Sequence, residues 1–286
     1  MRKDKSVVEK VLYPLFVEES QNLVMALFGD MKMSDEIPIL CPLGTGSKSN
    51  NDELRILLRS IEKNAIGMSK FYLMTTHAPD WLKPNERLEI VPLEDPPLCK
   101  DAVLIWKTLM TIKRKNITGD FVWVADDNVF MQPVDIRTIP PIHNHRPNSI
   151  FYKEPQTIWR KRVRHTLEWA KSKGIELQHQ FECHAPQRFS TDLIVKNEND
   201  QEWMYDDTGL TITTYFRVIS DTWRNSEDQT KWKQTYELPM EEIRTMKKED
   251  FCTKPFLGYS DCGVQAGLLD RLEEIFPEPS QWEVQA

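Results

Sequence analysis

The sequence lacks the features that mark several common classes of protein. No apolar run approaches the ~20 residues of a membrane-spanning helix, although 40% of its 286 residues are hydrophobic. Five cysteines lie far apart without a Cys-x-x-Cys pair, which argues against a zinc site or a disulfide framework. Acidic residues outnumber basic ones by 44 to 37, and the net charge of −7 argues against broad electrostatic binding of nucleic acid. We therefore expect a globular protein in the reducing cytoplasm, with no membrane span.

Apolar runs alternate with amphipathic helical patterns through the first half of the chain. Short runs rich in β-branched and aromatic residues predict strands, and apolar residues recurring every three or four positions predict helices. The expected strands are 37–41, 71–75, 88–92 and 121–125, and the expected helices are 51–64 and 101–115. This order predicts an α/β fold in which helices flank a mostly parallel sheet.

Two adjacent carboxylates, Asp126 and Asp127, follow the strand expected at 121–125. Residues at the C-terminal end of such a strand face the crevice where open α/β sheets bind ligands. Carboxylate oxygens suit Mg²⁺ or Mn²⁺, which usually bind one or two carboxylates together with substrate phosphates. The pair therefore predicts a metal site. The alternative is that the two aspartates only end a strand and cap a turn.

The loop after the first expected strand is the second candidate site. Gly44, Gly46 and Ser47 are small enough for the backbone to approach a ligand closely. The loop lacks the full spacing of a dinucleotide-binding or P-loop fingerprint. An ordinary connecting loop is therefore an equally good interpretation.

A local basic segment stands out against the overall negative charge. Four basic residues, Arg160, Lys161, Arg162 and Arg164, follow Trp159 at the start of a helical pattern. Such a run is usually a solvated helix face. The alternative is that it holds a phosphate-rich donor or a polyanionic acceptor.

Isolated polar residues at the ends of apolar runs complete the set of candidates. His184 lies near Arg188, Arg217 lies in a strand predicted over 213–217, and Asp261 ends the run that begins at Pro255. Taken singly, each of them is more often structural than catalytic.

Six segments, in order along residues 50–283, carry a family resemblance. They are Asn-Asp-Glu-Leu-Arg with Arg-Ser-Ile-Glu-Lys in 51–64, a strand with Pro-Asp-Trp-Leu in 71–82, Ala-Asp-Asp-Asn-Val-Phe in 125–130, Cys-His-Ala-Pro in 183–186, Leu-Gly-Tyr-Ser-Asp in 257–261, and Phe-Pro-Glu-Pro-Ser-Gln-Trp-Glu in 276–283. The ordered set resembles the Stealth family of sugar-phosphate transferases. That resemblance implies a GT-A-like, Rossmann-type nucleotide-sugar fold.

Departures from the family pattern favour transfer of the sugar alone. Residues 41–46 read Cys-Pro-Leu-Gly-Thr-Gly where the family has Val-Asp-Gly, and Ala125 and Ser260 stand in place of Asn. We expect a metal-dependent glycosyltransferase with a nucleotide-sugar donor. The first alternative is a Stealth-type sugar-1-phosphate transferase. The second is a non-catalytic carbohydrate- or nucleic-acid-binding protein on a transferase scaffold.

The resemblance implies a role for each candidate residue. Asp127, supported by Asp126, would hold Mn²⁺ or Mg²⁺ on the donor diphosphate. The other donor-binding candidates are Gly44, Gly46, Ser47, Asn51, Arg55, Lys100 and Asp126. Asp261 and His184 are candidates for the base, with Asp261 preferred because a carboxylate is ionised at pH 7. Arg188 and Arg217 would orient the donor phosphate or the acceptor.

The chain is expected to contain three parts. We expect a helical extension over residues 1–35 and a nucleotide-sugar-binding half over residues 36–135. An α+β acceptor and catalytic half of the same domain is expected over residues 136–286. The acceptor is a glycan hydroxyl by default. The basic segment beside Trp159 leaves a hydroxylated nucleic-acid base open as a second kind of acceptor.

Overall fold

The structure, a computed structural model, describes most of the chain from residue 36 onward. The described ranges are 36–44, 50–153, 157–196, 210–236 and 240–284. The extension predicted at 1–35, and Gly46 and Ser47 of the predicted donor loop, lie outside these ranges. Residues 37–286 form one compact unit, so the boundary proposed at residue 136 stays a prediction.

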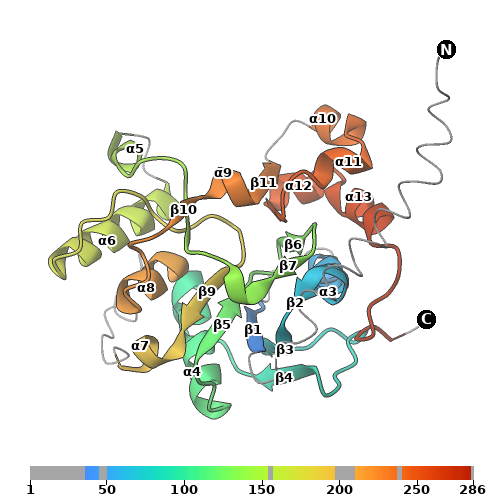
Figure 1. The fold of residues 1–286 in the computed structure, drawn as a ribbon, viewed down its shortest axis with the longest axis horizontal. Coiled ribbons are helices and arrows are strands. Elements are labelled where there is room, and N and C mark those ends of the chain that lie inside the picture. The colour runs from blue at the N-terminus through green and yellow to red at the C-terminus, as the bar shows by residue number, and fades with distance from the viewer. Residues whose placement is uncertain (1–35, 45–49, 154–156, 197–209, 237–239, 285–286) are drawn as a thin grey trace. The chain divides into compact units, whose positions relative to one another are not determined.

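A five-stranded sheet forms the centre of this unit (Figure 1). Its order is β4-β3-β1-β5-β9. The strands are β1 (Ile37–Pro42), β3 (Met68–Thr75), β4 (Leu88–Pro92), β5 (Asp120–Trp123) and β9 (Gln187–Ser190). The first four are parallel, and β9 pairs antiparallel with β5. The predicted α/β class with a mostly parallel sheet is therefore confirmed.

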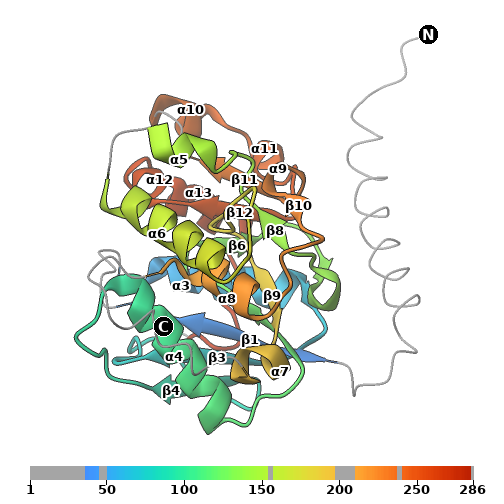
Figure 2. The same ribbon diagram turned by 90° about the vertical axis from the view of Figure 1, so that its left-hand side faces the viewer.

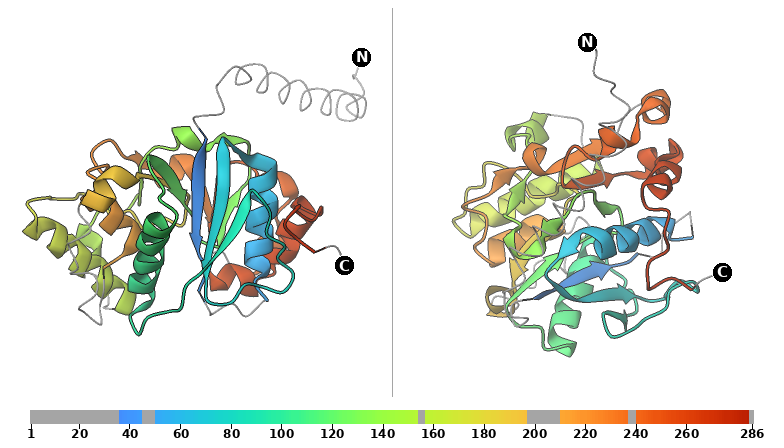
Figure 3. Two further views of the ribbon diagram at one scale, coloured as in Figure 1. Left: turned by 90° about the horizontal axis from the view of Figure 1, so that it is seen from below. Right: turned by 45° about the vertical axis from the view of Figure 1, so that its right-hand side comes forward.

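Helices cover both faces of the sheet (Figure 3). Alternate β1 side chains reach opposite faces, as the strand period of two requires. Ile39 and Cys41 pack with α3 (Asp52–Asn64), whereas Leu40 packs with α4 (Lys100–Arg114) and α8 (Ile212–Ile219). Burial on both faces explains why these strands appear in the sequence as continuous apolar runs.

A second, three-stranded sheet extends the fold beyond the carboxylate segment. Its order is β11-β12-β6, formed by β6 (Asn128–Phe130), β11 (Lys233–Tyr236) and β12 (Phe256–Tyr259). The helices packed beside it are α10 (Met240–Thr245), α11 (Lys248–Phe251), α12 (Asp261–Gln265) and α13 (Leu268–Ile275). Because β12 pairs antiparallel with β6, it runs toward the turn that holds Asp126 and Asp127.

The remaining elements lie in both halves of the unit. They are β2 (Ala65–Ile66), β7 (Val134–Asp135), η3 (Ile136–Thr138), β8 (Ile142–His143), β10 (Glu227–Asp228), α5 (Ser149–Lys153), α6 (Ile158–Ser172), α7 (Thr191–Lys196) and α9 (Gln229–Trp232). Within the described residues, no helix has the length and apolar character needed to cross a membrane.

The strand predicted over 213–217 is wrong, because these residues belong to helix α8. Every residue of α8 is buried, including Thr213 and Arg217. The helix is only eight residues long and consists mostly of β-branched and aromatic residues, which favour strands. A short buried helix and a buried strand then look alike in sequence.

The C-terminal segment folds back onto α3 through a buried ion pair. Arg59 donates from Nε and Nη2 to the two carboxylate oxygens of Glu283, each at 2.8 Å. The Ser280 backbone N–H donates to the same carboxylate at 2.9 Å. Trp282 between them is fully buried. Two of the family-like segments, far apart in sequence, thus form one structural joint.

Candidate active site

The candidate site lies at the carboxyl edge of the central sheet, between β1 and β5. The chain leaves β1 through α3 toward β3 on one side, and it enters β5 from α4 on the other. The connections therefore diverge between these two neighbouring strands. Such a topological switch point forms the crevice in which open α/β sheets bind ligands. Asp126 and Asp127 follow β5 at this position.

A tight turn fixes the two carboxylates. The Asn128 backbone N–H donates to the Ala125 carbonyl at 3.1 Å. The Asn128 side chain accepts from the Ala125 backbone N–H at 3.1 Å and donates to Asp127 Oδ1 at 2.9 Å. Asn128 is fully buried, so this side chain is itself held in place. The sequence analysis noted the amide but gave it no role, and the structure shows that it positions Asp127.

His184 approaches the pair from the segment before β9. Its Nδ1 lies 2.7 Å from Asp127 Oδ2, and 55% of its side chain is exposed. Its backbone adopts φ +41°, in the left-handed region that is uncommon for residues other than glycine. Gly258 of β12 packs directly against it, because a Cβ at Gly258 would overlap the His184 carbonyl and lie 2.8 Å from its Cβ. The absence of a side chain at Gly258 thus makes room for the His184 turn.

The site carries surplus negative charge. Burial, then Asp127 and Glu53, raise the pKa of Asp126 to about 7, and Lys100 opposes this shift. Burial and the same two aspartates also raise the pKa of Cys41 and of Tyr259 well above the usual values. Asp126 is thus a buried carboxyl group that resists ionisation, and strongly perturbed groups of this kind cluster at functional sites. It indicates that the site favours a positively charged ligand.

His184 supplies part of the compensating charge. The charge of the Asp127 carboxylate raises the pKa of His184 above its usual value. His184 therefore stays protonated to a higher pH than a free histidine. Because Nδ1 faces Asp127, this contact also sets the orientation of the imidazole ring.

The donor set fits a divalent cation that arrives with a phosphate ligand. Asp127 directs Oδ1 toward Asn128 and Oδ2 toward His184, and Asp126 is its immediate neighbour. In the part of the chain that the structure describes, no group of three or more His, Cys, Asp or Glu side chains forms a complete metal cage. Mg²⁺ and Mn²⁺ do not need one, since they commonly bind one or two carboxylates and complete their coordination with phosphates and water.

The rim of the site joins the N-terminus of α4 to helix α6. Asp101, next to Lys100, lies 3.4 Å from Arg162 Nη1, and both side chains are 17% exposed. Burial raises the pKa of Asp101, while Arg162, Lys100 and His184 oppose that shift. The basic segment predicted around Trp159 thus reaches the candidate site through Arg162.

Three of the predicted site residues are held by partners within the fold. Arg55 Nη1 lies 3.4 Å from Glu283, and its guanidinium stacks on Trp81 at 4.2 Å from the ring centroid. Arg188 donates to the Arg137 carbonyl. Arg217 is buried and donates to the Arg188 carbonyl at 2.7 Å.

Burial lowers the pKa of Arg217 to about 9. Its contacts, which include Gln187 Oε1 at 2.5 Å, hold the β9 segment in place. Arg217 therefore lacks a group that faces a ligand, and we leave it out of the functional proposal. Arg55 likewise contributes to the joint with Glu283.

The remaining predicted residues lie around the site edge. Gly44 follows β1, Asn51 precedes α3 with φ 60°, and Lys100 begins α4. Asp261 is exposed at the start of α12, two residues beyond the end of β12. Because β12 runs toward the carboxylate turn, Asp261 falls at the same edge of the fold.

Two electrostatic neighbours of the site were missed by the sequence analysis. Glu53, in the first turn of α3, raises the pKa of both Asp126 and Tyr259. Tyr259 follows the residue that pairs with Asn128. Both lie in segments that resemble the family, which was the only available signal. A glutamate at a helix start otherwise indicates a solvated residue near the helix dipole.

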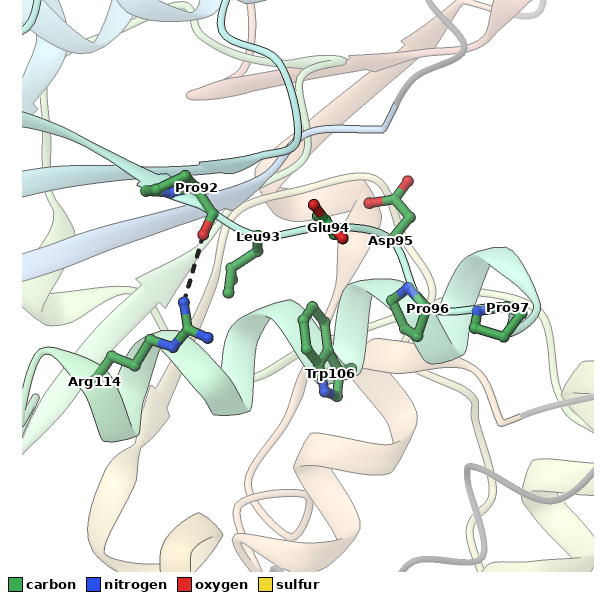
Figure 4. Close-up of a pocket in the computed structure, with 8 residues that line it drawn as sticks. All are labelled: Pro92, Leu93, Glu94, Asp95, Pro96, Pro97, Trp106 and Arg114. Atoms are coloured by element: carbon green, nitrogen blue, oxygen red, sulfur yellow. Dashed lines mark hydrogen bonds between the residues drawn. The ribbon is translucent and has the colours of Figure 1, made fainter.

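A cavity of about 510 Å³ has a lining that includes neither Asp126 nor Asp127 (Figure 4). It is formed by the connection from Pro92 to Pro97 together with Trp106 and Arg114 of α4. Lys107, fully buried in α4, lies 2.5 Å from Asp95 Oδ1 and donates to the Leu43 carbonyl at 2.9 Å. This lysine therefore ties the wall of the cavity to the end of β1.

Fold and site together define a mixed α/β protein with an acidic site at a sheet switch point. No family model matches the chain, and no curated protein matches it. Among solved structures, it is similar to a crystal structure of a glycosyltransferase involved in the glycosylation of the major capsid of PBCV-1. That likeness covers 84% of this chain and 99% of the other, with a TM-score of 0.41 and 12% identity. At this distance the likeness does not bear on activity.

Proposed function

We propose that the protein is a metal-dependent glycosyltransferase that moves a sugar from a nucleotide-sugar donor to an acceptor hydroxyl. The supporting observation is the pair Asp126 and Asp127 at the switch point between β1 and β5, in a turn that is held by hydrogen bonds of the Asn128 side chain. The surplus negative charge of this pair favours a cation. A cation bound by only two carboxylates usually completes its coordination with substrate phosphates and water, and a donor diphosphate supplies such phosphates.

Asp127 and Asp126 are the residues that would hold the cation. When bound, Mn²⁺ or Mg²⁺ neutralises the charge that develops on the leaving diphosphate. The chain's own cations would assist from the rim: Lys100 at the start of α4, and His184 while protonated. Gly44 and Asn51, at the ends of β1 and α3, would line the donor side.

The acceptor hydroxyl needs a group that takes its proton. Asp261, an exposed carboxylate at the site edge, is the proposed base. His184 is less suited to that role, because the neighbouring carboxylate favours its protonated form. We assign to His184 the positioning of Asp127 through the 2.7 Å contact. Arg188 is left without a role here, because its guanidinium contacts the Arg137 carbonyl and Asp120 at the far end of β5.

Sugar-1-phosphate transfer is the second candidate function. It is supported by the six family-like segments, of which three meet at the site: the Asp126–Asp127 turn, His184, and β12 with Gly258. A glycosyltransferase breaks the sugar–phosphate bond and releases a nucleoside diphosphate. A sugar-phosphate transferase breaks the diphosphate and releases a nucleoside monophosphate.

A nucleotide-release assay distinguishes these candidate functions. The full chain is incubated with a panel of nucleotide sugars, Mn²⁺ and hydroxyl acceptors, and the released nucleotide is identified by chromatography. A nucleoside diphosphate is expected. A monophosphate would replace the first proposal with the second. Binding of nucleotide sugars with no turnover over a broad acceptor panel would favour a non-catalytic binding protein.

A further inference from the structure

An exposed aromatic and basic surface lies where helix α5 meets helix α6. We call it the α5–α6 corner and define it by Tyr152, Ile158, Trp159, Arg160 and Lys161. Its three large hydrophobic residues are 49%, 69% and 42% exposed, in that order. They are three of the four exposed large hydrophobic side chains in the described ranges. Clustering of this kind marks an interaction site, whereas single exposed hydrophobics are ordinary.

The aromatic part of the corner has a fixed support. The Trp159 ring packs edge-on against buried Phe151, with ring centroids 5.6 Å apart. Phe151 in turn packs with Val163 and Leu167 of α6. Trp159 is therefore held by the core on one side while remaining 42% exposed. A rigid, half-exposed indole is suited to stacking on a planar ring.

The charge of the corner is positive, although the chain as a whole carries −7. Arg160, Lys161, Arg162 and Arg164 crowd the first two turns of α6, and its first turn holds no acidic residue. Lys161 is exposed, and Arg162 points to Asp101 at the rim of the candidate site. The surface therefore offers local attraction to an anionic partner.

The corner lies next to the candidate active site. Ile158 and Trp159 are four and three residues before Arg162, so they share its side of the helix. Arg162 Nη1 is 3.4 Å from Asp101, which follows Lys100 at the start of α4. Figure 2 shows α6 lying between α5 and α4. A long ligand on the corner would thus extend toward Asp126 and Asp127.

We propose that the α5–α6 corner binds an unpaired nucleic-acid strand. Basic side chains contact the phosphates and aromatic rings stack on the bases, the combination that proteins use for single strands. A neutral glycan would use the aromatic rings but not the basic side chains. A sulfated or carboxylated polymer would use the basic side chains but has no planar bases. The role of the strand as acceptor rests on the proposed function, whereas its binding does not.

Fluorescence anisotropy of a labelled oligothymidine of about twelve nucleotides, at about 50 mM salt, tests this proposal. No metal or nucleotide sugar is added. Lys161→Glu is compared with Arg224→Glu, because Arg224 is an exposed arginine stacked on another tryptophan, Trp223, at 4.5 Å. The stacking role is tested with Trp159→Ala. Thermal melts confirm that each variant is folded.

Lys161→Glu and Trp159→Ala are each expected to weaken binding by about tenfold, and Arg224→Glu by less than about twofold. No binding by the wild-type chain, or an equal loss in Lys161→Glu and Arg224→Glu, overturns the proposal. So does unchanged affinity in Trp159→Ala. Dextran sulfate that binds as tightly, with the same dependence on Trp159, would identify an anionic glycan instead and also overturn it.

Failure of the proposed function is distinguishable in the same assay. Asp127→Asn is expected to bind the oligonucleotide as tightly as wild type, because the corner does not include the carboxylates. Absence of any nucleotide-sugar turnover, with oligonucleotide binding intact, would refute the transferase proposal and leave the binding surface standing. Loss of strand binding in Asp127→Asn would overturn the placement of the strand on the corner.

Discussion

Two carboxylate clusters in this protein have opposite electrostatic character. At the joint between α3 and the C-terminal segment, Glu283 receives hydrogen bonds from Arg59 and Ser280. Although burial acts the other way, these bonds hold the pKa of Glu283 below its usual value. At the switch point, burial and the neighbouring Asp127 raise the pKa of Asp126 to about 7. Within the fold, Glu283 is paired with hydrogen-bond donors, whereas the pair Asp126 and Asp127 keeps negative charge that is only partly balanced.

This difference assigns the two clusters different roles, although both lie in segments that resemble one family. A fully paired buried carboxylate stabilises the fold only while its partner is present. A carboxylate pair whose charge is only partly balanced, here by His184 and Lys100, carries a cost that a bound cation would relieve. Replacing the charged group should therefore reduce stability at the joint and activity at the switch point.

Glu283→Gln is expected to give the largest loss of stability. It leaves the Arg59 guanidinium, only 8% exposed, without its buried carboxylate and with only the exposed Glu273 at 3.6 Å, which costs about 3–5 kcal/mol. Urea unfolding measures the free energy of unfolding. Asp127→Asn is the matched carboxylate-to-amide control and should not fall below wild type. Equal losses of unfolding free energy in both variants would contradict the proposed difference between the two clusters.

Asp127→Asn is expected to give the largest loss of activity. The amide retains the size of the side chain but removes the charge that pairs with the cation. Turnover should fall about a hundredfold, equivalent to roughly 2.7 kcal/mol in the barrier. The nucleotide-release assay measures this loss, with Glu283→Gln at a temperature where it remains folded as control. Near-normal turnover in Asp127→Asn would contradict the assignment.

Gly258→Ala tests the position of His184. An added Cβ overlaps the His184 carbonyl, so the His184 segment must shift away from Asp127. We expect turnover to fall about tenfold, and the pKa of His184, followed by NMR titration, to drop toward that of a free histidine. Substitution that leaves this pKa unchanged would show that Gly258 does not position the imidazole.

The pH dependence of stability tests the raised pKa of Asp126. Because the folded-state pKa of Asp126 is about 7, above the usual value of 3.8, the folded state retains a proton that the unfolded state releases. The contribution of Asp126 to the free energy of unfolding therefore falls as pH rises from about 4 to about 7. The melting temperature of Asp126→Asn relative to wild type should rise over this window. A constant difference from pH 4 to pH 8 would contradict the raised pKa.

Much of the sheet was predictable from sequence because its strands are short apolar runs between helical patterns. The expected strand 88–92 coincides with β4, and the expected helix 101–115 differs from α4 by one residue at each end. Lys107 was not predictable as a buried residue, since a lysine in an amphipathic helix normally faces solvent. Its burial depends on the distant partners Asp95 and Leu43.

The two central carboxylates of the site were predictable from the sequence, but the distant residues that contact them were not. Asp126 and Asp127 carried a local signal, namely two carboxylates after a buried strand. Their contact with His184 joins residues 57 positions apart, and no local pattern specifies such pairing. Arg217 was misplaced for the same reason, because its burial depends on tertiary packing. The loop around Gly46 and Ser47 lies outside the described residues, so their donor-binding role stays a prediction.

Calorimetric binding of nucleoside diphosphates tests the central claim most directly. A panel of these products is titrated into wild type and Asp127→Asn, each with Mn²⁺ and with EDTA. We expect at least one nucleoside diphosphate to bind wild type at least about tenfold more tightly with Mn²⁺, and expect Asp127→Asn to lose this difference. Tight binding that is the same in Mn²⁺ and EDTA, or unchanged in Asp127→Asn, would contradict a cation site at the switch point.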